Sequence, residues 1–216
     1  SMVCILRVRA AGNLKPDGDA LNPSPLRIHV EYQIPNAQEE PQLTPERRAF
    51  LLDELLPSAV AEVSRRLLAR YPARGDLTLP RQCEREIVFR NGTRPGFCTS
   101  YAPVRPFCSF PELGVRNNRS LYGPAKVYDC SGLQCVAEEL PGGPGVPQAD
   151  FVLYATSKNV SCGASTLAYS GFCELDPETG RPLAGYVNFC PASISLEPCK
   201  FGVQLATGVH EILHAL

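Results

Sequence analysis

Three residues near the carboxyl end of the sequence carry the side chains best suited to chemistry: His210, Glu211 and His214. In a helix, residues four positions apart lie on one face, one turn apart, so both imidazoles can reach the same metal ion. Glu211 directly follows the first histidine, where its carboxylate can take a proton from a metal-bound water. The spacing therefore predicts two metal ligands, His210 and His214, and a general base, Glu211.

This H-E-x-x-H pattern is typical of zinc peptidases, so the predicted cofactor is Zn²⁺. The alternative is an ordinary amphipathic helix whose polar side chains bind no metal. An apolar face at helical spacing surrounds the pattern and is formed by Val209, Ile212, Leu213 and Leu216. Imidazoles and a carboxylate buried beside such a face would be costly unless paired or bound to metal, which favours the metal.

A catalytic zinc normally takes three protein ligands, so one more ligand must come from outside this pattern. His29, the remaining histidine, lies in an alternating run at residues 26–32 that predicts a strand with His29 on its polar side. We expect His29 to face solvent, and it can be a zinc ligand only if the fold brings this strand to the helix. The sequence ends two residues after His214, so we expect this polypeptide alone to be inactive.

The overall composition indicates a protein of the secretory pathway. Ten cysteines without a C-x-x-C pair predict disulfides formed in an oxidising compartment. Three glycosylation sequons, at Asn91, Asn118 and Asn159, agree with a secreted or cell-surface location. The net charge of −1 predicts no nucleic acid partner. No apolar run reaches the roughly 18 residues of a transmembrane helix, so membrane association would require parts beyond the carboxyl end of this sequence.

The elements that must position the motif predict an α+β fold. Thr44 as N-cap and Pro45 in the first turn predict a long helix that ends at residues 71–72, with Pro57 kinking or dividing it. Apolar periodicity predicts further strands at residues 149–155, 165–173 and 184–189. An exposed edge of their sheet could hold an extended peptide by backbone pairing.

The chain divides into segments of different character. We predict an irregular lead-in at residues 1–24, which could be the remnant of a pro-segment, followed by one domain at residues 25–216. Within that domain, residues 73–147 are rich in proline, glycine and cysteine and predict a disulfide-stapled insertion with little regular structure. Its aromatic residues could form a small local core or, alternatively, a substrate exosite: Phe97, Tyr101, Phe107, Phe110 and Tyr122.

With these elements in order, the sequence resembles the leishmanolysin family of metzincin-type zinc metallopeptidases, which are secreted or surface-anchored. The matching blocks are residues 43–47, 56–60, 150–154, 167–169, 181–188 and 209–216. The resemblance implies a metzincin-like N-terminal catalytic subdomain, in which a mixed sheet, a long helix and a zinc-binding helix carry a disulfide-rich insertion. It also implies that His210 and His214 are zinc ligands and that Glu211 is the general base.

Other parts of the family pattern do not fall within this sequence. The family's third histidine and its methionine-containing turn lie downstream of the second histidine, whereas the single methionine here is Met2. Family members also carry a pro-segment cysteine that can ligate zinc and silence the enzyme. Cys4 is open to that role, although we favour the alternative that it pairs with another cysteine.

Three functions follow from these residues. The predicted function is a zinc-dependent metalloendopeptidase that acts on protein or peptide substrates, present here as an incomplete catalytic domain with Glu211 activating a zinc-bound water. The alternative is a catalytically inactive truncated isoform that acts as a secreted binding or cell-adhesion module. A secreted disulfide-rich structural module with an accidental motif is the third class.

Overall fold

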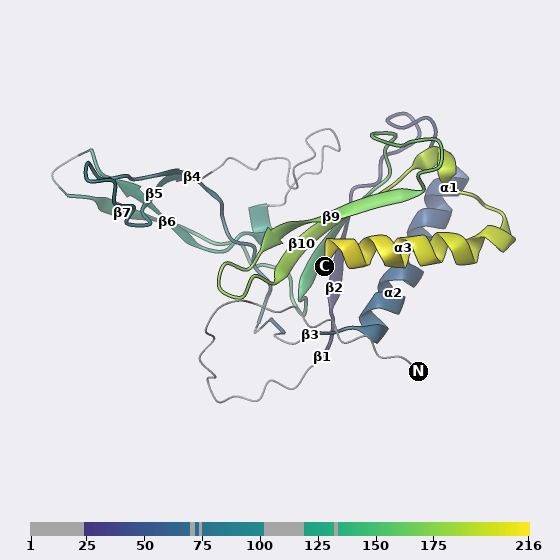
Figure 1. Ribbon diagram of the computed structural model, residues 1–216, viewed down its shortest axis with the longest axis horizontal. Coiled ribbons are helices and arrows are strands. Elements are labelled where there is room, and N and C mark those ends of the chain that lie inside the picture. The colour runs from purple at the N-terminus through teal and green to yellow at the C-terminus, as the bar shows by residue number, and fades with distance from the viewer. Residues whose placement is uncertain (1–23, 70–71, 74, 102–118, 132–133) are drawn as a thin grey trace.

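The structure is a computed structural model that describes residues 24–69, 72–73, 75–101, 119–131 and 134–216. Its centre is a four-stranded mixed sheet in the order β2 (Ile28–Tyr32), β8 (Phe151–Thr156), β10 (Pro182–Phe189) and β9 (Ala168–Leu175) (Figure 1). Strand β8 pairs in parallel with β2 and β10, and β9 runs antiparallel at the edge. The predicted α+β class and its strands are confirmed. The lead-in predicted at residues 1–24 lies outside the described residues except for Ser24, and Cys4, Phe107, Phe110 and Asn118 lie outside them too.

Alternate residues of the sheet face two different cores. On β8, Phe151 and Leu153 pack into a core shared with the helices, whereas Val152 and Tyr154 pack into a second core on the opposite face. All four side chains belong to residues without exposed surface. Such burial on both faces explains the nearly continuous apolar run of this strand. In the described part of the chain, the α-helices therefore pack on one face of the sheet.

The long helix predicted from residue 44 is built in three parts. Helix α1 (Pro45–Phe50) begins at Thr44, whose side chain caps the Arg47 amide, and it leads into a π-helical segment (Leu51–Leu55) and then helix α2 (Leu56–Arg66). Pro57 explains the wider turn, since it has no amide hydrogen and cannot continue the α-helical pattern. The predicted division near Pro57 is confirmed.

The predicted end of this helix at residues 71–72 is wrong. Helix α2 ends at Arg66, and Leu67 is already extended. Strand β3 (Leu68–Ala69) follows at once and pairs with β1 (Ser24–Pro25). Pairing with a distant part of the chain therefore ends the helix before the local apolar pattern does.

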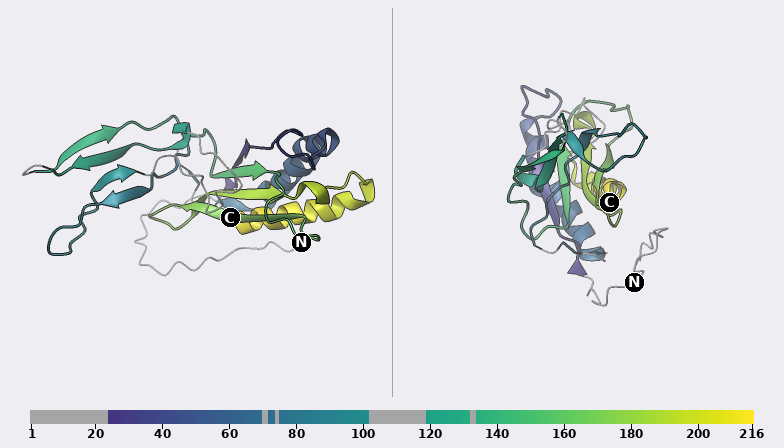
Figure 2. Two further views of the ribbon diagram at one scale, coloured as in Figure 1. Left: turned by 90° about the horizontal axis from the view of Figure 1, so that it is seen from above. Right: turned by 90° about the vertical axis from the view of Figure 1, so that its left-hand side faces the viewer.

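The cysteine-rich region contains more regular structure than we predicted. Two antiparallel hairpin ribbons form there, β4 (Cys83–Glu86) with β5 (Cys98–Tyr101) and β6 (Ala125–Asp129) with β7 (Val136–Leu140), and they project from the central sheet (Figure 2). The expectation of little regular structure is wrong because most of these strand residues are exposed, so their sequence shows no apolar alternation. Among the predicted aromatic residues, Phe97 stacks on Tyr128 at a centroid distance of 4.3 Å.

The base of this region closes over the second face of the sheet. Leu77 and Val146, which lie before and after the ribbons, exchange two backbone hydrogen bonds of 2.8 and 2.9 Å. Both side chains, together with Leu79 and Leu121, pack in the core beneath β8 and β10. The chain therefore contacts the second core before the first ribbon, between the two ribbons and after the second ribbon.

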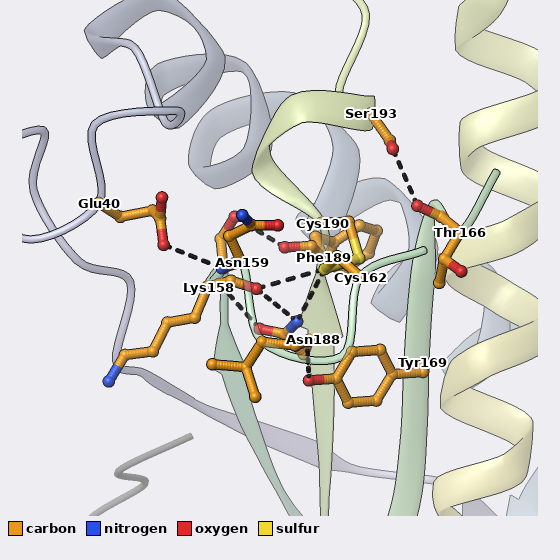
Figure 3. The surroundings of a disulfide bond; sticks show 12 residues. Glu40, Lys158, Asn159, Cys162, Thr166, Tyr169, Asn188, Phe189, Cys190 and Ser193 are labelled. Carbon is orange, nitrogen blue, oxygen red and sulfur yellow. Dashed lines mark hydrogen bonds between the residues drawn. A yellow bond between two sulfur atoms is a disulfide. The ribbon is translucent and has the colours of Figure 1, made fainter. Parts of the chain in front are cut away.

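Disulfides fix several loops, as the cysteine count predicts. The bonds among the described residues are Cys83–Cys98, Cys130–Cys135 and Cys162–Cys190. Cys162–Cys190 joins the loop after β8 to the end of β10 (Figure 3). Beside it, the buried Asn188 side chain accepts from the Lys158 amide at 2.9 Å and donates to the Lys158 carbonyl at 3.0 Å. The segment that leads from Cys190 to the helix at residues 201–215 is therefore fixed at its start by the disulfide and by these hydrogen bonds.

Candidate active site

The predicted motif lies on helix α3 (Phe201–Ala215), which packs against β9, β10 and α2. Its buried residues recur every three or four positions, as an amphipathic helix requires: Gln204, Gly208, Ile212 and Ala215. Two glycines permit the close packing. A Cβ atom on Gly208 would lie 3.1 Å from the Ala59 Cβ, and one on Gly185 would lie 2.8 Å from the Ala215 Cβ.

The start of α3 is held by a buried side-chain amide. Gln204 accepts a hydrogen bond from the Ser195 amide and donates one to the Ser195 carbonyl, each at 2.9 Å. Paired in this way, the buried amide has its polar atoms satisfied and locks the first turn of the helix to the preceding loop. The sequence showed no sign of this contact, because nothing in the local pattern separates Gln204 from an exposed glutamine.

The two motif imidazoles converge. The Nε2 atoms of His210 and His214 lie 3.0 Å apart, and the ring planes are nearly perpendicular at 87°. Two nitrogens on one tetrahedral zinc ion would lie about 3.3 Å apart, given Zn–N distances of about 2.05 Å. The spacing and the donor atoms of this pair therefore fit a shared metal ion.

The expected burial of these two imidazoles is wrong. His210 and His214 are both exposed, whereas Glu211 is partly buried and Ile212 is fully buried. The apolar residues that suggested burial belong to the helix face that packs on the sheet, and the imidazoles lie beside that face rather than within it. Leu213, expected on the same apolar face, is 41% exposed. The structural case for a metal thus depends on the convergence of the nitrogens and not on the cost of burial.

Glu211 lies between α3 and the edge strand β9. The Ser170 hydroxyl oxygen is 2.9 Å from the Glu211 Oε2 atom and 2.6 Å from the Glu211 carbonyl oxygen. Ser170 is paired in register with Val187 of β10, and both face α3. The sequence analysis placed Ser170 in a strand but missed this contact, since a single sequence gives no signal for pairing across about forty residues.

His29 does not join the motif. It lies on β2, at the other end of the strand order from β9. Its register partner Val152 belongs to the core on the sheet face opposite the helices, and the His29 ring bonds Glu31 at 2.9 Å. In the part of the chain that the structure describes, no group of three or more histidine, cysteine, aspartate or glutamate residues could hold a metal ion.

The surface beside the motif combines an unpaired strand edge with apolar side chains. Within the described sheet, β9 pairs with β10 on one side and is the last strand on the other. Phe172, which is 60% exposed, lies two residues after Ser170 and so projects from the same face. No helix in the described ranges has the length and apolar character needed to cross a membrane.

Known proteins show a consistent similarity to this chain. Residues 113–216 match the family model described as leishmanolysin. The leishmanolysin-like peptidases of Caenorhabditis briggsae and Drosophila pseudoobscura pseudoobscura are 31% identical over 93% and 89% of the chain. The ciliated left-right organizer metallopeptidase of Mus musculus is 30% identical over 90% of it. The chain spans 29%, 27% and 28% of these three relatives.

Proposed function

The chain belongs to the leishmanolysin family of peptidases, and we propose that it supplies the zinc-binding helix and the general base of a zinc-dependent metalloendopeptidase. One observation carries the proposal: the Nε2 atoms of His210 and His214 converge to 3.0 Å on the exposed side of α3. These two residues would hold the ion. When bound, zinc supplies a water of near-neutral pKa and a Lewis acid for a peptide carbonyl.

Glu211 would move the proton. An ionised carboxylate beside the metal ligands can accept a proton from the attacking water and then pass it to the leaving amine. The position of Glu211 suits this role, because the residue lies where α3 meets the edge strand β9 and is only partly buried. The third metal ligand would come from a segment outside the described residues, as the family pattern implies.

The edge of β9 would bind the substrate. An extended peptide can add to a free strand edge through main-chain hydrogen bonds, while side chains on alternate positions contact the neighbouring surface. The contact between Ser170 and Glu211 places the carboxylate directly beside this edge. The exposed Phe172 ring lies on the same side and would contact an apolar substrate side chain. We therefore propose a protein or extended peptide as substrate.

The described disulfides support an oxidising location, and we propose that the protein is secreted or displayed at the cell surface. Two of the sequons, at Asn91 and Asn159, lie on exposed residues and would accept N-glycans there.

A catalytically inactive binding or adhesion module is the second candidate. It is supported by the lack of a third potential ligand beside His210 and His214 in the described ranges. The projecting ribbons, β4–β5 and β6–β7, would then provide the binding surface (Figure 1). This form would be stable and folded but would neither retain zinc tightly nor cleave peptides.

Paired measurements on the longest natural form of the protein separate the two candidates. Metal analysis of the purified protein should find one zinc per chain, and a quenched peptide library should be cleaved. The Glu211→Ala variant should keep its zinc but lose cleavage, because both ligands remain and only the base is removed. Cleavage by Glu211→Ala at the parent rate would disprove the assignment of the base. A parent protein that binds no zinc would favour the second candidate.

A further inference from the structure

A single hydroxyl group on the edge strand reaches Glu211 at two places. The Ser170 oxygen lies 2.6 Å from the Glu211 carbonyl oxygen and 2.9 Å from its Oε2 atom. When the carboxylate is ionised, both of these oxygens are acceptors, and the one hydroxyl proton serves either or both. The Glu211 side chain is therefore folded back along its own turn of α3, toward β9.

The backbone of the helix does not require this contact. Helix α3 continues to Ala215, whose amide is the normal i+4 donor to the Glu211 carbonyl. Without Ser170 that carbonyl would still have a partner. What the hydroxyl adds is a fixed position for the carboxylate, which otherwise has three freely rotating side-chain bonds.

The strand that carries Ser170 is itself well anchored. Its neighbour Tyr169 packs in the core on the other sheet face and donates a hydrogen bond to the Val160 carbonyl at 2.7 Å. Farther along β9, Cys173 is disulfide-bonded. Serine is also the shortest hydroxyl side chain, so the position of its oxygen is determined closely by the backbone. A group held on such a rigid element can position its partner accurately.

We propose that Ser170 is a positioning residue that holds the Glu211 carboxylate at the junction of α3 and the β9 edge. This inference rests on the proposed peptidase function, since it concerns the geometry of the base in that reaction. A misplaced catalytic group costs turnover more than substrate binding. Ser170 therefore affects kcat, whereas the affinity for zinc is determined by the two histidines.

Three variants test the proposal. Ser170→Ala removes the hydroxyl, and Ser170→Thr retains it with a methyl group that strands tolerate well. Ser193→Ala is the matched control: it removes a serine hydroxyl that donates to the Thr166 carbonyl at 2.8 Å, away from the motif. Each variant is made in the longest natural form of the protein. The readouts are a crystal structure, zinc affinity, kcat and KM.

The expected results differ between structural and positioning roles. In Ser170→Ala the Glu211 carboxylate should leave its position beside β9, zinc affinity should stay unchanged, and kcat should fall about tenfold with KM unaltered. Ser170→Thr should restore most of kcat, and Ser193→Ala should match the parent. A carboxylate that keeps its position in the Ser170→Ala crystal, or an unchanged kcat in that variant, overturns the inference. A parent protein that does not cleave peptides would refute the proposed function instead, and the crystal structure would still decide whether Ser170 holds Glu211.

Discussion

The guanidinium of Arg27 donates two side-chain hydrogen bonds to the buried carboxylate of Asp150, from Nε to Oδ2 at 2.9 Å and from Nη2 to Oδ1 at 2.8 Å. The backbone amides of Arg27 and Ala73 donate to the same carboxylate at 3.1 and 2.7 Å. Asp150 has no exposed surface and immediately precedes β8, whereas Arg27 precedes β2. This ion pair thus fixes the start of two neighbouring strands and the connection after β3.

Replacing Asp150 with alanine should destabilise the domain. The change leaves a partly buried guanidinium and two backbone amides without their acceptor. Breaking such an ion pair lowers the free energy of unfolding by about 3 kcal/mol, and because the Arg27 side chain is partly exposed to water, the loss should not exceed this value. Urea unfolding followed by circular dichroism measures the effect. The exposed Asp76→Ala serves as control and should change stability by less than about 0.5 kcal/mol.

The Asp150 contribution should also depend on pH. Burial would raise the pKa of this carboxyl, but the bonds from Arg27 and Ala73 prevail and lower it below its ordinary value of 3.8. Stability from Asp150 is therefore complete above that value and disappears as the pH falls through the lower, folded-state pKa. Parent and Asp150→Ala unfolding curves should converge in acid, and a gap that persists unchanged at the lowest pH would contradict this account.

The effect of Glu174 on stability should depend on pH in the opposite direction to that of Asp150. Burial raises the pKa of this carboxyl from 4.5 to about 7, against a long hydrogen bond of 3.5 Å from Gln82. At pH values between 4.5 and about 7, the Glu174 carboxyl is ionised in the unfolded chain but still protonated in the folded protein. The parent protein therefore loses stability as the pH rises from 4.5, and the loss is complete above about pH 7. Glu174→Gln should then be up to about 3 kcal/mol more stable than the parent at pH 8, with little gain at pH 4.

Urea midpoints at several pH values measure this difference. Glu178→Gln, which changes an exposed carboxyl of the same region, should follow the parent curve throughout. If the advantage of Glu174→Gln were the same at pH 4 and pH 8, titration of Glu174 would not be its cause.

Removal of either motif imidazole should weaken zinc binding. His210→Ala and His214→Ala each delete a ligand, and we expect affinity to fall by more than about 100-fold, since even outer-shell changes cost 10- to 100-fold. Competition with a coloured chelator measures the constant. His29→Ala provides the comparison: its ring bonds Glu31 on the sheet face away from the helices, so it should retain full affinity. Equal losses in all three variants would argue against the assigned pair.

The close approach of α3 to the sheet predicts opposite effects for two glycine substitutions. A Cβ atom at Gly185 would meet the Ala215 Cβ and carbonyl oxygen at 2.8 Å, so Gly185→Ala must shift the helix and should destabilise by about 1–3 kcal/mol. A Cβ atom at Gly202, on the same helix, would meet nothing within 4 Å. Gly202→Ala should therefore be neutral or stabilise by up to about 1 kcal/mol.

Thermal unfolding of both alanine variants gives the comparison directly. The Gly185 variant should also lose zinc affinity, because the helix that carries both imidazoles has moved. A Gly185→Ala protein as stable as the Gly202→Ala protein would mean that the sheet and α3 adjust without strain.

Local patterns predicted most of what lies within one element. The four-residue spacing of His210 and His214 was sufficient to predict their convergence, because a helix alone brings them together. Strand alternation likewise located β2, β8, β9 and β10. Whether the imidazoles are exposed was not predictable, since that depends on which side of α3 meets the sheet. The contact of Ser170 with Glu211 also depends on tertiary packing, and so does the end of α2 at Arg66.

The exposed ribbons escaped prediction for a different reason. Residues of β4 and β7 contact solvent on both sides, so no core imposes an alternating pattern on their sequence. Hydrogen-bonded pairing and two disulfides hold them instead. Such strands are visible only once their partners are known.

The two backbone hydrogen bonds between Leu77 and Val146 join the chain segments that lead into and out of the ribbon region, and we call this junction the neck. Length, glycosylation or sequence can change within β4–β5 and β6–β7 without altering the path of any strand beneath α3, because the core residues beyond the neck, Leu79 and Leu121, lie outside these strands. A protease that nicks a ribbon would leave both halves of the chain bound to one scaffold, because each half buries apolar residues in the same core on its side of the neck. The fold thereby separates the ribbons, whose sequence can vary, from helix α3, whose position on the sheet must be preserved.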